Sequence, residues 1–411
     1  MRKISVLILL FCACLSVAAR DKINIVIQAG DYDREDCVVS AEVSPLNFNG
    51  SEIILYETAK GKKQKVVSQL ASGKKPVLYW ILTGKTPAGS SRTFVAEWSK
   101  KKQSSAKYQM EIEDTQKALV LKKNGKPVLQ YNYAHLDPPQ GVDKSFGRSG
   151  FIHPAYSPDG NILTTIQPKD HRHHFGIWNP WTHLVYDGIL YDLWNIGDKQ
   201  GTVRAKDIEA IYQGNIFAGY VAGLDHFIFT PAGEKIVMNE QWDIKTWNTG
   251  EGFLWNFTSY LHPSTPLPVL LQQYRYAGFG YRATEEWTKE NSEMFTSEGK
   301  TRQQIDGSTA RWIYVTGQTK TGRSGLLFLG HPENYNSPEP LRIWDEAAND
   351  GRGDVFINFA PTKNKDWELK PGNTYALRYQ VLSYEGEMTS ERANRIWNDF
   401  AYPPSVAIKT Y

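Results

Sequence analysis

The densest group of ionisable side chains in the chain is the stretch Asp170-His171-Arg172-His173-His174. Imidazole titrates close to neutral pH, so a histidine cluster beside an acid and an arginine suggests proton transfer, anion binding or metal ligation. In an extended segment, His171 and His173 would point to one face, and Arg172 and His174 to the other. We predict that His171, His173 or His174 acts as an acid or base and that Asp170 orients an imidazole. The alternative is that one or two of these histidines are hydrogen-bonded core or loop groups.

The second candidate for chemistry is Glu240, which lies in the stretch Ile236-Val237-Met238-Asn239-Glu240-Gln241-Trp242-Asp243-Ile244. Strand alternation places this carboxylate on the same face as four apolar residues. Burial raises the pKa of a carboxyl group and makes an unpaired charge costly, which suits a general acid or base. The alternative is a buried ion pair with Arg275 or Arg282.

The segment Tyr274-Arg275-Tyr276-Ala277-Gly278-Phe279-Gly280-Tyr281-Arg282 interleaves aromatic residues with arginines. A guanidinium matches the geometry of a carboxylate, so an acidic sugar is a natural partner, although ordinary strand packing also explains the pattern. Trp178 and Tyr276 could stack on a sugar ring. His153 and His331 each precede proline, in extended or loop segments where sites tend to lie. The residues predicted to contact substrate are His153, Arg172, Trp178, Arg275, Tyr276, Arg282 and His331.

A metal site at the histidines is a further possibility, because His-x-His pairs occur in copper and zinc proteins. The chain has neither a His-Glu-x-x-His pair nor a set of cysteines at metal spacing. We therefore predict no metal ligands and no cofactor, with copper, iron or zinc at the histidine cluster as the alternative.

The elements that must position these residues are strands. Short β-branched and aromatic runs before residue 105 predict a small antiparallel β-sandwich at 20–105. A hairpin with a type I′ turn at Asn124-Gly125 opens a larger domain at 116–390, and long strands follow. Residues 391–411 form a C-terminal helix and tail, because Ala393, Ile396, Trp397 and Phe400 recur at helical spacing. The predicted class is all-β.

The ends and composition place the protein outside the cytoplasm. Residues 1–19 have the basic start, short apolar core and small-residue end of a signal peptide. A lipid anchor on Cys14 is an alternative, and no later stretch is apolar enough to span a membrane. The net charge of +3 argues against nucleic acid, whereas 13 tryptophans and 22 tyrosines favour sugar binding. We expect an exported protein of the periplasm or cell exterior.

Five ordered segments in residues 116–390 resemble the bacterial PmoA family, often labelled methane oxygenase. They are His153-Pro154-Ala155-Tyr156-Ser157-Pro158-Asp159-Gly160, Asp170-His171-Arg172-His173-His174-Phe175-Gly176, Tyr276-Ala277-Gly278-Phe279-Gly280-Tyr281-Arg282, Ser297-Glu298-Gly299 and His331-Pro332-Glu333-Asn334. The resemblance implies a β-supersandwich like that of galactose mutarotases and polysaccharide-active enzymes. In such sandwiches a histidine and a carboxylate commonly exchange protons with a sugar, and His171, His173 and Glu240 are residues of these kinds.

These observations predict an exported carbohydrate-processing enzyme of the hydrolase, lyase or epimerase type. Two alternatives remain open. One is a glycan-binding protein without catalytic activity, and the other is the metal-dependent oxygenase that the family label suggests.

Overall fold

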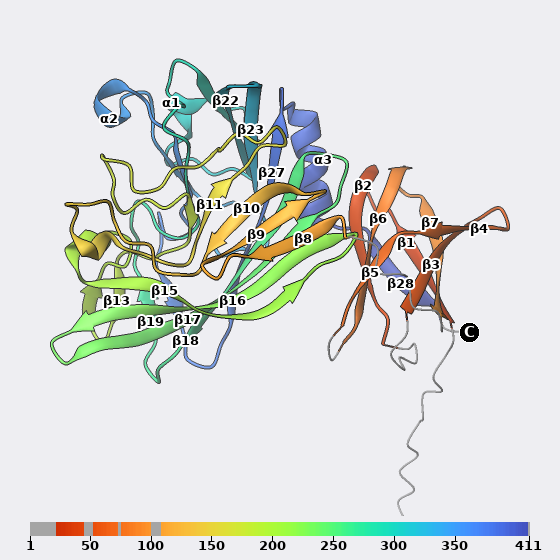
Figure 1. Ribbon diagram of the computed structural model, residues 1–411, viewed down its shortest axis with the longest axis horizontal. Helices are drawn as coiled ribbons and strands as arrows, with labels where there is room; N and C mark the ends of the chain where they lie inside the picture. The colour runs from red at the N-terminus through yellow and green to blue at the C-terminus, as the bar shows by residue number, and fades with distance from the viewer. Residues whose placement is uncertain (1–21, 45–51, 73–74, 100–107, 410–411) are drawn as a thin grey trace, which may run out of the picture.

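The computed structural model describes residues 22–44, 52–72, 75–99 and 108–409, and almost all of their regular structure is antiparallel β-strand (Figure 1). The predicted signal peptide, Cys14 and the basic run at 100–105 lie outside the described residues. Among the described residues, no helix is both long enough and apolar enough to cross a membrane.

The N-terminal part is a small sandwich of two sheets. Its apolar residues alternate with exposed ones, as in Ile23, Ile25 and Ile27, and this alternation buries one face of each sheet against the other. The five-stranded sheet has the order β28-β1-β7-β3-β4 and the three-stranded sheet the order β2-β6-β5. The bounds are β1 Lys22–Gln28, β2 Arg34–Glu42, β3 Glu52–Ala59, β4 Lys62–Val66, β5 Ser68–Ala71, β6 Val77–Thr86, β7 Ser91–Ser99 and β28 Ser405–Lys409.

The larger part contains two eight-stranded antiparallel sheets. The first, here called the site sheet, has the order β24-β25-β20-β12-β11-β10-β9-β8. Its strands are β8 Met110–Asp114, β9 Ala118–Lys123, β10 Lys126–Asn132, β11 Phe151–Ala155, β12 Ile177–Trp178, β20 Gly280–Arg282, β24 Leu341–Ile343 and β25 Phe356–Phe359.

The second, here called the long-strand sheet, has the order β15-β16-β17-β18-β27-β23-β22-β21. Its strands are β15 Gly201–Tyr212, β16 Phe217–Thr230, β17 Gly233–Trp247, β18 Phe253–Pro263, β21 Ser292–Thr296, β22 Trp312–Thr319, β23 Gly322–Gly330 and β27 Tyr375–Glu385. A four-stranded sheet, β14-β13-β19-β26, is formed by β13 Leu184–Tyr186, β14 Ile189–Tyr191, β19 Val269–Leu271 and β26 Trp367–Leu369.

One hydrophobic core lies between the inner faces of the two large sheets. The site sheet contributes Ile177 and Tyr281, and the long-strand sheet contributes Trp242 and Phe257. Because strand side chains alternate, Trp178, which directly follows Ile177, lies on the opposite, outer face of the site sheet. That outer face carries a separate cluster of aromatic side chains, and the candidate site is built there.

The C-terminal helix α3, Ser390–Ala401, packs on the outer face of the long-strand sheet against Trp312 and Leu382. Its first turn is capped by the Thr389 side chain, which accepts a hydrogen bond from the Arg392 N–H. The chain then returns to the N-terminal sandwich, where β28 pairs with β1. The buried ion pair between Arg34 and Asp399, at 2.9 Å, joins the sandwich to the end of α3.

The structure confirms the predicted all-β fold, with its sandwiches and short C-terminal helix. Asn124 and Gly125 have φ values of 51° and 79° at the tip of the β9–β10 hairpin, as a type I′ turn requires. The prediction for the tail was incomplete, because residues 405–409 form a strand that pairs with β1, about 380 residues away in the sequence. Besides α3, the described residues contain the short α-helices α1 Arg302–Ile305 and α2 Ala348–Gly351 and the 3-10 helices η1 Lys144–Phe146 and η2 Ile196–Asp198.

Candidate functional site

The three clustered histidines lie in a turn and not in a strand. The His171 N–H donates to the Pro168 carbonyl at 3.1 Å, and the His174 N–H donates to the His171 carbonyl at 3.0 Å. This turn brings all three imidazole rings together, with centroids 5.4 Å apart for His171 and His173, 4.8 Å for His171 and His174, and 4.8 Å for His173 and His174. The predicted alternation of faces is therefore wrong, because local backbone hydrogen bonds replace the extended conformation.

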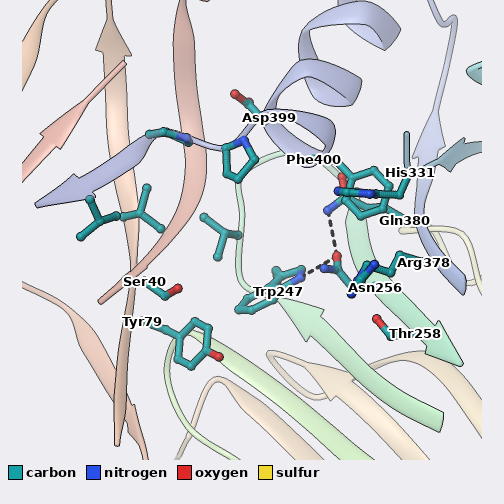
Figure 2. Close-up of a pocket in the computed structure, with 15 residues that line it drawn as sticks. Ser40, Tyr79, Trp247, Asn256, Thr258, His331, Arg378, Gln380, Asp399 and Phe400 are labelled. Atoms are coloured by element: carbon teal, nitrogen blue, oxygen red, sulfur yellow. Dashed lines mark hydrogen bonds between the residues drawn. The ribbon is translucent and has the colours of Figure 1, made fainter. Parts of the chain in front are cut away.

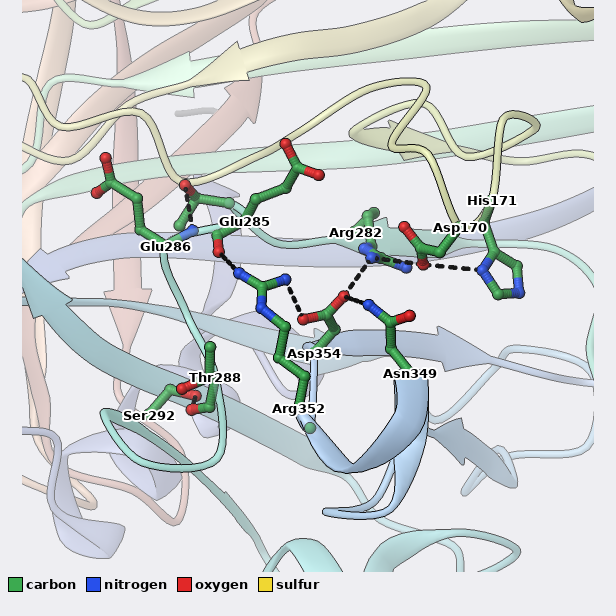
Figure 3. A network of polar contacts seen from close by, with 12 residues as sticks. Asp170, His171, Arg282, Glu285, Glu286, Thr288, Ser292, Asn349, Arg352 and Asp354 are labelled. Atoms are coloured by element: carbon green, nitrogen blue, oxygen red, sulfur yellow. Dashed lines mark hydrogen bonds and ion pairs between the residues drawn. The ribbon is translucent and has the colours of Figure 1, made fainter.

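His171 is held by a carboxylate. Its Nδ1 lies 2.9 Å from Asp170 Oδ2, and 38% of the His171 side chain is exposed (Figure 3). Since the carboxylate accepts a hydrogen bond from Nδ1, the neutral form of the imidazole has its free lone pair on Nε2. No hydrogen bond to Nε2 occurs among the residues that the structure describes. The pair therefore has the geometry of an oriented general base.

Asp170 is in turn fixed by Arg282. Nη2 of Arg282 lies 2.9 Å from Asp170 Oδ2 and 2.8 Å from Asp354 Oδ2. Asn349 Nδ2 donates to the same Asp354 oxygen at 2.8 Å, and Arg352 Nη1 lies 2.5 Å from the other oxygen. Figure 3 shows these side chains converging from the loop before β12, from β20 and from the segment around α2. The predicted binding of an acidic substrate by Arg282 is not supported, because its charge is already neutralised by two carboxylates inside the protein.

Burial lowers the pKa values of two of the three imidazoles. Burial lowers the pKa of His173 to about 4, with a further contribution from His171, and burial lowers the pKa of the enclosed His174 well below its usual value. Both rings are therefore neutral near pH 7. Burial alone would raise the pKa of Asp170, but the hydrogen bond with His171 and the charge of Arg282 together lower it, so this group is an anion.

Aromatic side chains surround the histidines. The Trp344 ring lies 4.5 Å from the His171 ring and 4.5 Å from the Arg282 guanidinium, and it is half-buried. Trp178 was predicted to stack on substrate, but it is fully buried beneath His174 and Trp194, at centroid distances of 5.0 Å from each. Trp344 is thus the tryptophan that offers a surface beside His171.

Tyr276, which was predicted to stack on substrate, lies at the edge of the same aromatic cluster. Its ring packs 5.2 Å from Trp194, and its hydroxyl accepts a hydrogen bond from Asn195 Nδ2 at 3.0 Å. Asp192 caps this turn through the N–H groups of residues 194 and 195 and also binds the Asn195 amide. Arg275 is exposed and lies over the Tyr276 ring at 5.4 Å, so it remains available to a ligand at the rim.

An open cavity of about 810 Å³ adjoins the histidine turn. Asp170, Arg172, Gln167, Glu285 and Asn349 contribute to its walls. Arg172 donates from Nη1 to the Gln167 carbonyl at 2.6 Å, which leaves its other nitrogens at the cavity. The cavity has the size of a small-molecule site, and its lining mixes polar side chains with the apolar residues Pro139, Ile166 and Pro168.

Glu240 does not join this site. Its side chain is fully buried in the core, where it lies 2.8 Å from His226 Nε2 and accepts hydrogen bonds from the side chains of Asn179, Ser259 and Trp242. The predicted acid-base role of Glu240 is not supported, because β17 directs the side chain into the core between the sheets, whereas the histidine turn lies on the outer face of the site sheet. The alternative pairing with Arg275 or Arg282 is also wrong, since the partner is His226.

Two further predicted histidines make their contacts with residues outside the histidine turn. His153 bonds through Nδ1 to the Thr164 hydroxyl at 2.8 Å, and burial lowers its pKa to about 4. No ring contact joins it to the histidine turn among the described residues. His331 packs against Phe400 of α3 at 5.1 Å, on the outer face of the long-strand sheet. The prediction that His331 belongs to this site is wrong. The residue directly follows β23, which lies in the long-strand sheet, so its side chain is on the other side of the sandwich.

Within the described part of the chain, no group of three or more His, Cys, Asp and Glu side chains is arranged to hold a metal ion.

Several residues that build the site were not predicted from the sequence, namely Asp192, Trp194, Asn195, Trp344 and Asp354. The tripeptide Arg352-Gly353-Asp354 gave the clearest available signal, since it places an acid beside a tight turn. Nothing in its sequence neighbourhood indicates that its partner is Arg282.

Comparison with solved structures gives distant likenesses. An alpha-mannosidase from Enterococcus faecalis V583 matches with 9% identity and a TM-score of 0.49, over 96% of this chain and 47% of that one. A glycosyl hydrolase family 38 protein from Enterococcus faecalis matches with 9% identity and a TM-score of 0.43, over 96% of this chain and 48% of that one. This chain thus spans about half the length of these two proteins.

A galactose mutarotase related enzyme from Lactobacillus acidophilus matches with 9% identity and a TM-score of 0.28, over 67% of this chain and 97% of that one. With TM-scores below 0.5, none of the three likenesses bears on the function. No curated protein matches the sequence significantly.

A family model matches residues 118–398, and its description is "Family of unknown function (DUF6807)". The predicted membership of the PmoA family is therefore wrong. The ordered segments that suggested it lie inside the matched range, but the model they match is a different one.

Proposed function

This chain belongs to the DUF6807 family of unknown function, and from that premise we propose that it is an exported carbohydrate-processing enzyme in which His171 transfers a proton to or from a sugar. The observation that carries the proposal is the Asp170–His171 pair. A carboxylate 2.9 Å from Nδ1 leaves Nε2 as a base at the protein surface.

The charged side chains next to His171 hold its imidazole in one position, as a general base requires. Asp170 cannot swing away, because Arg282 holds it and Asp354 holds Arg282 from the other side. The rotamer and the tautomer of His171 are therefore both set before substrate binds, which lowers the cost of reaching the reactive geometry.

The surroundings favour a sugar as substrate. Trp344 supplies an aromatic surface beside His171, Tyr276 supplies another beside Trp194, and the adjoining cavity offers the amides of Gln167 and Asn349. Aromatic faces pack on the C–H face of a sugar ring, and amides bind its hydroxyl groups. Arg172 and Lys169 also line the cavity and would hold the carboxylate of an acidic sugar in place of Arg282.

Within the predicted reaction types, the geometry favours epimerisation, mutarotation or elimination over hydrolysis. Glycoside hydrolysis commonly needs two carboxyl groups that face the scissile bond. Asp170 and Asp354 both bind Arg282, and Asp192 caps a turn, so these three carboxylates are already engaged. Glu285 alone does not supply the pair of carboxyl groups that hydrolysis needs. The imidazole of His171 is the group oriented to move a proton.

The test uses purified protein with neutral reducing sugars in one arm and uronic acids and uronate oligosaccharides in the other. Proton NMR in D₂O reads out anomeric interconversion, solvent exchange at a ring carbon and formation of an unsaturated product. We expect turnover in one arm, and we expect His171→Ala to reduce kcat/KM by roughly 10²- to 10⁴-fold.

The matched control is His262→Ala, which removes another half-buried imidazole whose Nδ1 binds the Thr374 hydroxyl. It should leave turnover unchanged. Full activity of His171→Ala would refute the role of this residue. Sugar binding without any product, in wild type and variant alike, would instead support a glycan-binding protein.

The proposal of export rests on residues 1–19. Mass spectrometry of the mature N-terminus from a periplasmic fraction should show cleavage near Ala19. A protein that retains Met1 in the cytoplasmic fraction would contradict it.

A further inference from the structure

A second cavity, of about 400 Å³, lies where three parts of the chain meet. The N-terminal sandwich contributes Ser40 and Tyr79, the outer face of the long-strand sheet contributes Asn256 and Thr258, and the end of α3 contributes Phe400 (Figure 2). The histidine turn lies on the outer face of the other large sheet, so both sheets and the core separate the two cavities.

The cavity holds polar groups that have no partner in the protein. Asn256 Oδ1 accepts from Trp247 Nε1 at 3.1 Å and from Gln380 Nε2 at 2.8 Å, which orients the amide and leaves Nδ2 as a donor. Figure 2 shows this short chain of hydrogen bonds along one wall. Among the described residues, the hydroxyls of Ser40, Tyr79 and Thr258 make no hydrogen bond, so they remain available to a ligand.

Aromatic and apolar surfaces alternate with these polar groups. Tyr79 packs 5.7 Å from Trp247 at an interplanar angle of 42°, and Phe400 packs edge-on to His331 at 5.1 Å. Burial raises the pKa of Tyr79 to about 12, so its hydroxyl stays protonated and can donate as well as accept.

The charged side chains at this cavity are compensated within the protein. Asp399 pairs with Arg34 at 2.9 Å, and Arg378 lies 3.2 Å from Glu333. Burial lowers the pKa of His331, which favours its neutral form near pH 7. The walls therefore fit an uncharged ligand with several hydroxyl groups and one apolar face.

We propose that this cavity is a binding site for a neutral mono- or disaccharide, separate from the site at His171. Its volume lies in the range of small-molecule sites, and a position between two domains is a common one for such sites. In this proposal the N-terminal sandwich takes part in binding, because its Tyr79 and Ser40 form one wall of the cavity. It does not depend on any activity of His171.

Isothermal titration calorimetry on the full chain tests the proposal with glucose, galactose, mannose, maltose, cellobiose and lactose. The informative variants are Tyr79→Phe, which removes one hydroxyl of the cavity, and Thr258→Trp, which fills it. The matched control is Tyr260→Phe, since Tyr260 lies on the same face of β18 just outside the cavity. His171→Ala serves as the control for the other site.

We expect at least one sugar to bind, with Tyr79→Phe weakening it about 5- to 20-fold, as loss of one hydrogen bond predicts. Thr258→Trp should abolish binding, and Tyr260→Phe and His171→Ala should not change it. Circular dichroism and the thermal midpoint show whether Thr258→Trp still folds, and Tyr79→Phe provides the decisive reading if it does not.

Three outcomes overturn the proposal. The first is that no sugar of the panel binds to the wild-type protein. The second is that Tyr79→Phe binds the sugar as tightly as the wild type does. The third is that binding is lost in His171→Ala and kept in Thr258→Trp, which would place the sugar at the histidine turn.

Discussion

Arg282 and Asp354 form an ion pair at 2.8 Å with side chains that are 1% and 3% exposed, at the point where β20 meets the segment after α2. The same guanidinium nitrogen binds Asp170 at 2.9 Å, and the ring of Trp344 covers the guanidinium at 4.5 Å. Arg282 therefore links the buried carboxylate of Asp354 to Asp170, the residue that orients His171.

Replacement of Arg282 by methionine should destabilise the protein by about 3–5 kcal/mol, because two carboxylates would lose their buried partner. Urea denaturation followed by tryptophan fluorescence measures the change. The control is Arg204→Met, which breaks the exposed pair with Glu234 and should cost less than about 1 kcal/mol. An equal effect of both substitutions would show that the Arg282 network contributes no more than a surface pair.

Asp170→Asn should impair catalysis more than binding. An amide can donate to Nδ1 of His171, which would stabilise the tautomer with the proton on Nε2 and remove the base. On the substrate found in the screen, we expect kcat to fall by about 10²-fold or more with KM little changed. Asp137→Asn, at a side chain that is 85% exposed beside His135, is the control. An unchanged kcat for Asp170→Asn would show that Asp170 does not position His171 for catalysis.

Stability should fall as the pH decreases from about 6.5 to 4. Burial lowers the folded-state pKa of His153 and His173 to about 4 and that of His174 further, whereas the unfolded chain titrates near 6.5. At these three histidines the unfolded state therefore binds more protons in this window, so their contribution to stability is present above pH 6.5 and lost below it. Glu339 and Asp399, whose pKa values burial raises to about 7 and about 6, act in the opposite direction. The three histidines outweigh the two carboxyl groups, and we expect a net loss of a few kcal/mol on an order-of-magnitude basis.

Urea denaturation at pH 7, 6, 5 and 4 measures this slope. His173→Gln should make it shallower, whereas His135→Gln, at an imidazole that is 56% exposed, should leave it unchanged. A flat profile for the wild type over this range would contradict the prediction.

Glu240→Gln should affect stability and not the chemical step. The carboxylate accepts hydrogen bonds from Asn179, Ser259 and Trp242 in the core, and an amide would turn N–H groups toward some of those donors. We expect a loss of about 1–3 kcal/mol in unfolding free energy. Activity per folded molecule should stay within about twofold of wild type. A 10²-fold loss of rate in a folded variant would show that Glu240 takes part in catalysis.

Local patterns in the sequence determined much of the scaffold. Alternating apolar residues predict the strands of both sandwiches, because one face of a half-buried strand must be apolar. Asn-Gly at 124 and 125 specifies the β9–β10 turn through its positive φ values. Helical spacing of Ala393, Ile396 and Trp397 predicts the buried face of α3. The histidine cluster was also evident, since it depends on residue types alone.

Only the tertiary structure decided which charged groups meet. Alternation showed that Glu240 shares a face with apolar residues, but strand register placed His226 on the same face of the neighbouring strand β16, where its Nε2 lies 2.8 Å from the carboxylate. In the same way, Asp354 and Trp344 reach the histidine turn because β25 lies beside β20 in the sheet and β24 lies beside β25. The contacts of Arg282 with Asp170 and Asp354 join residues that are 112 and 72 positions apart in the chain, and their free energy comes from long-range packing that no local pattern encodes.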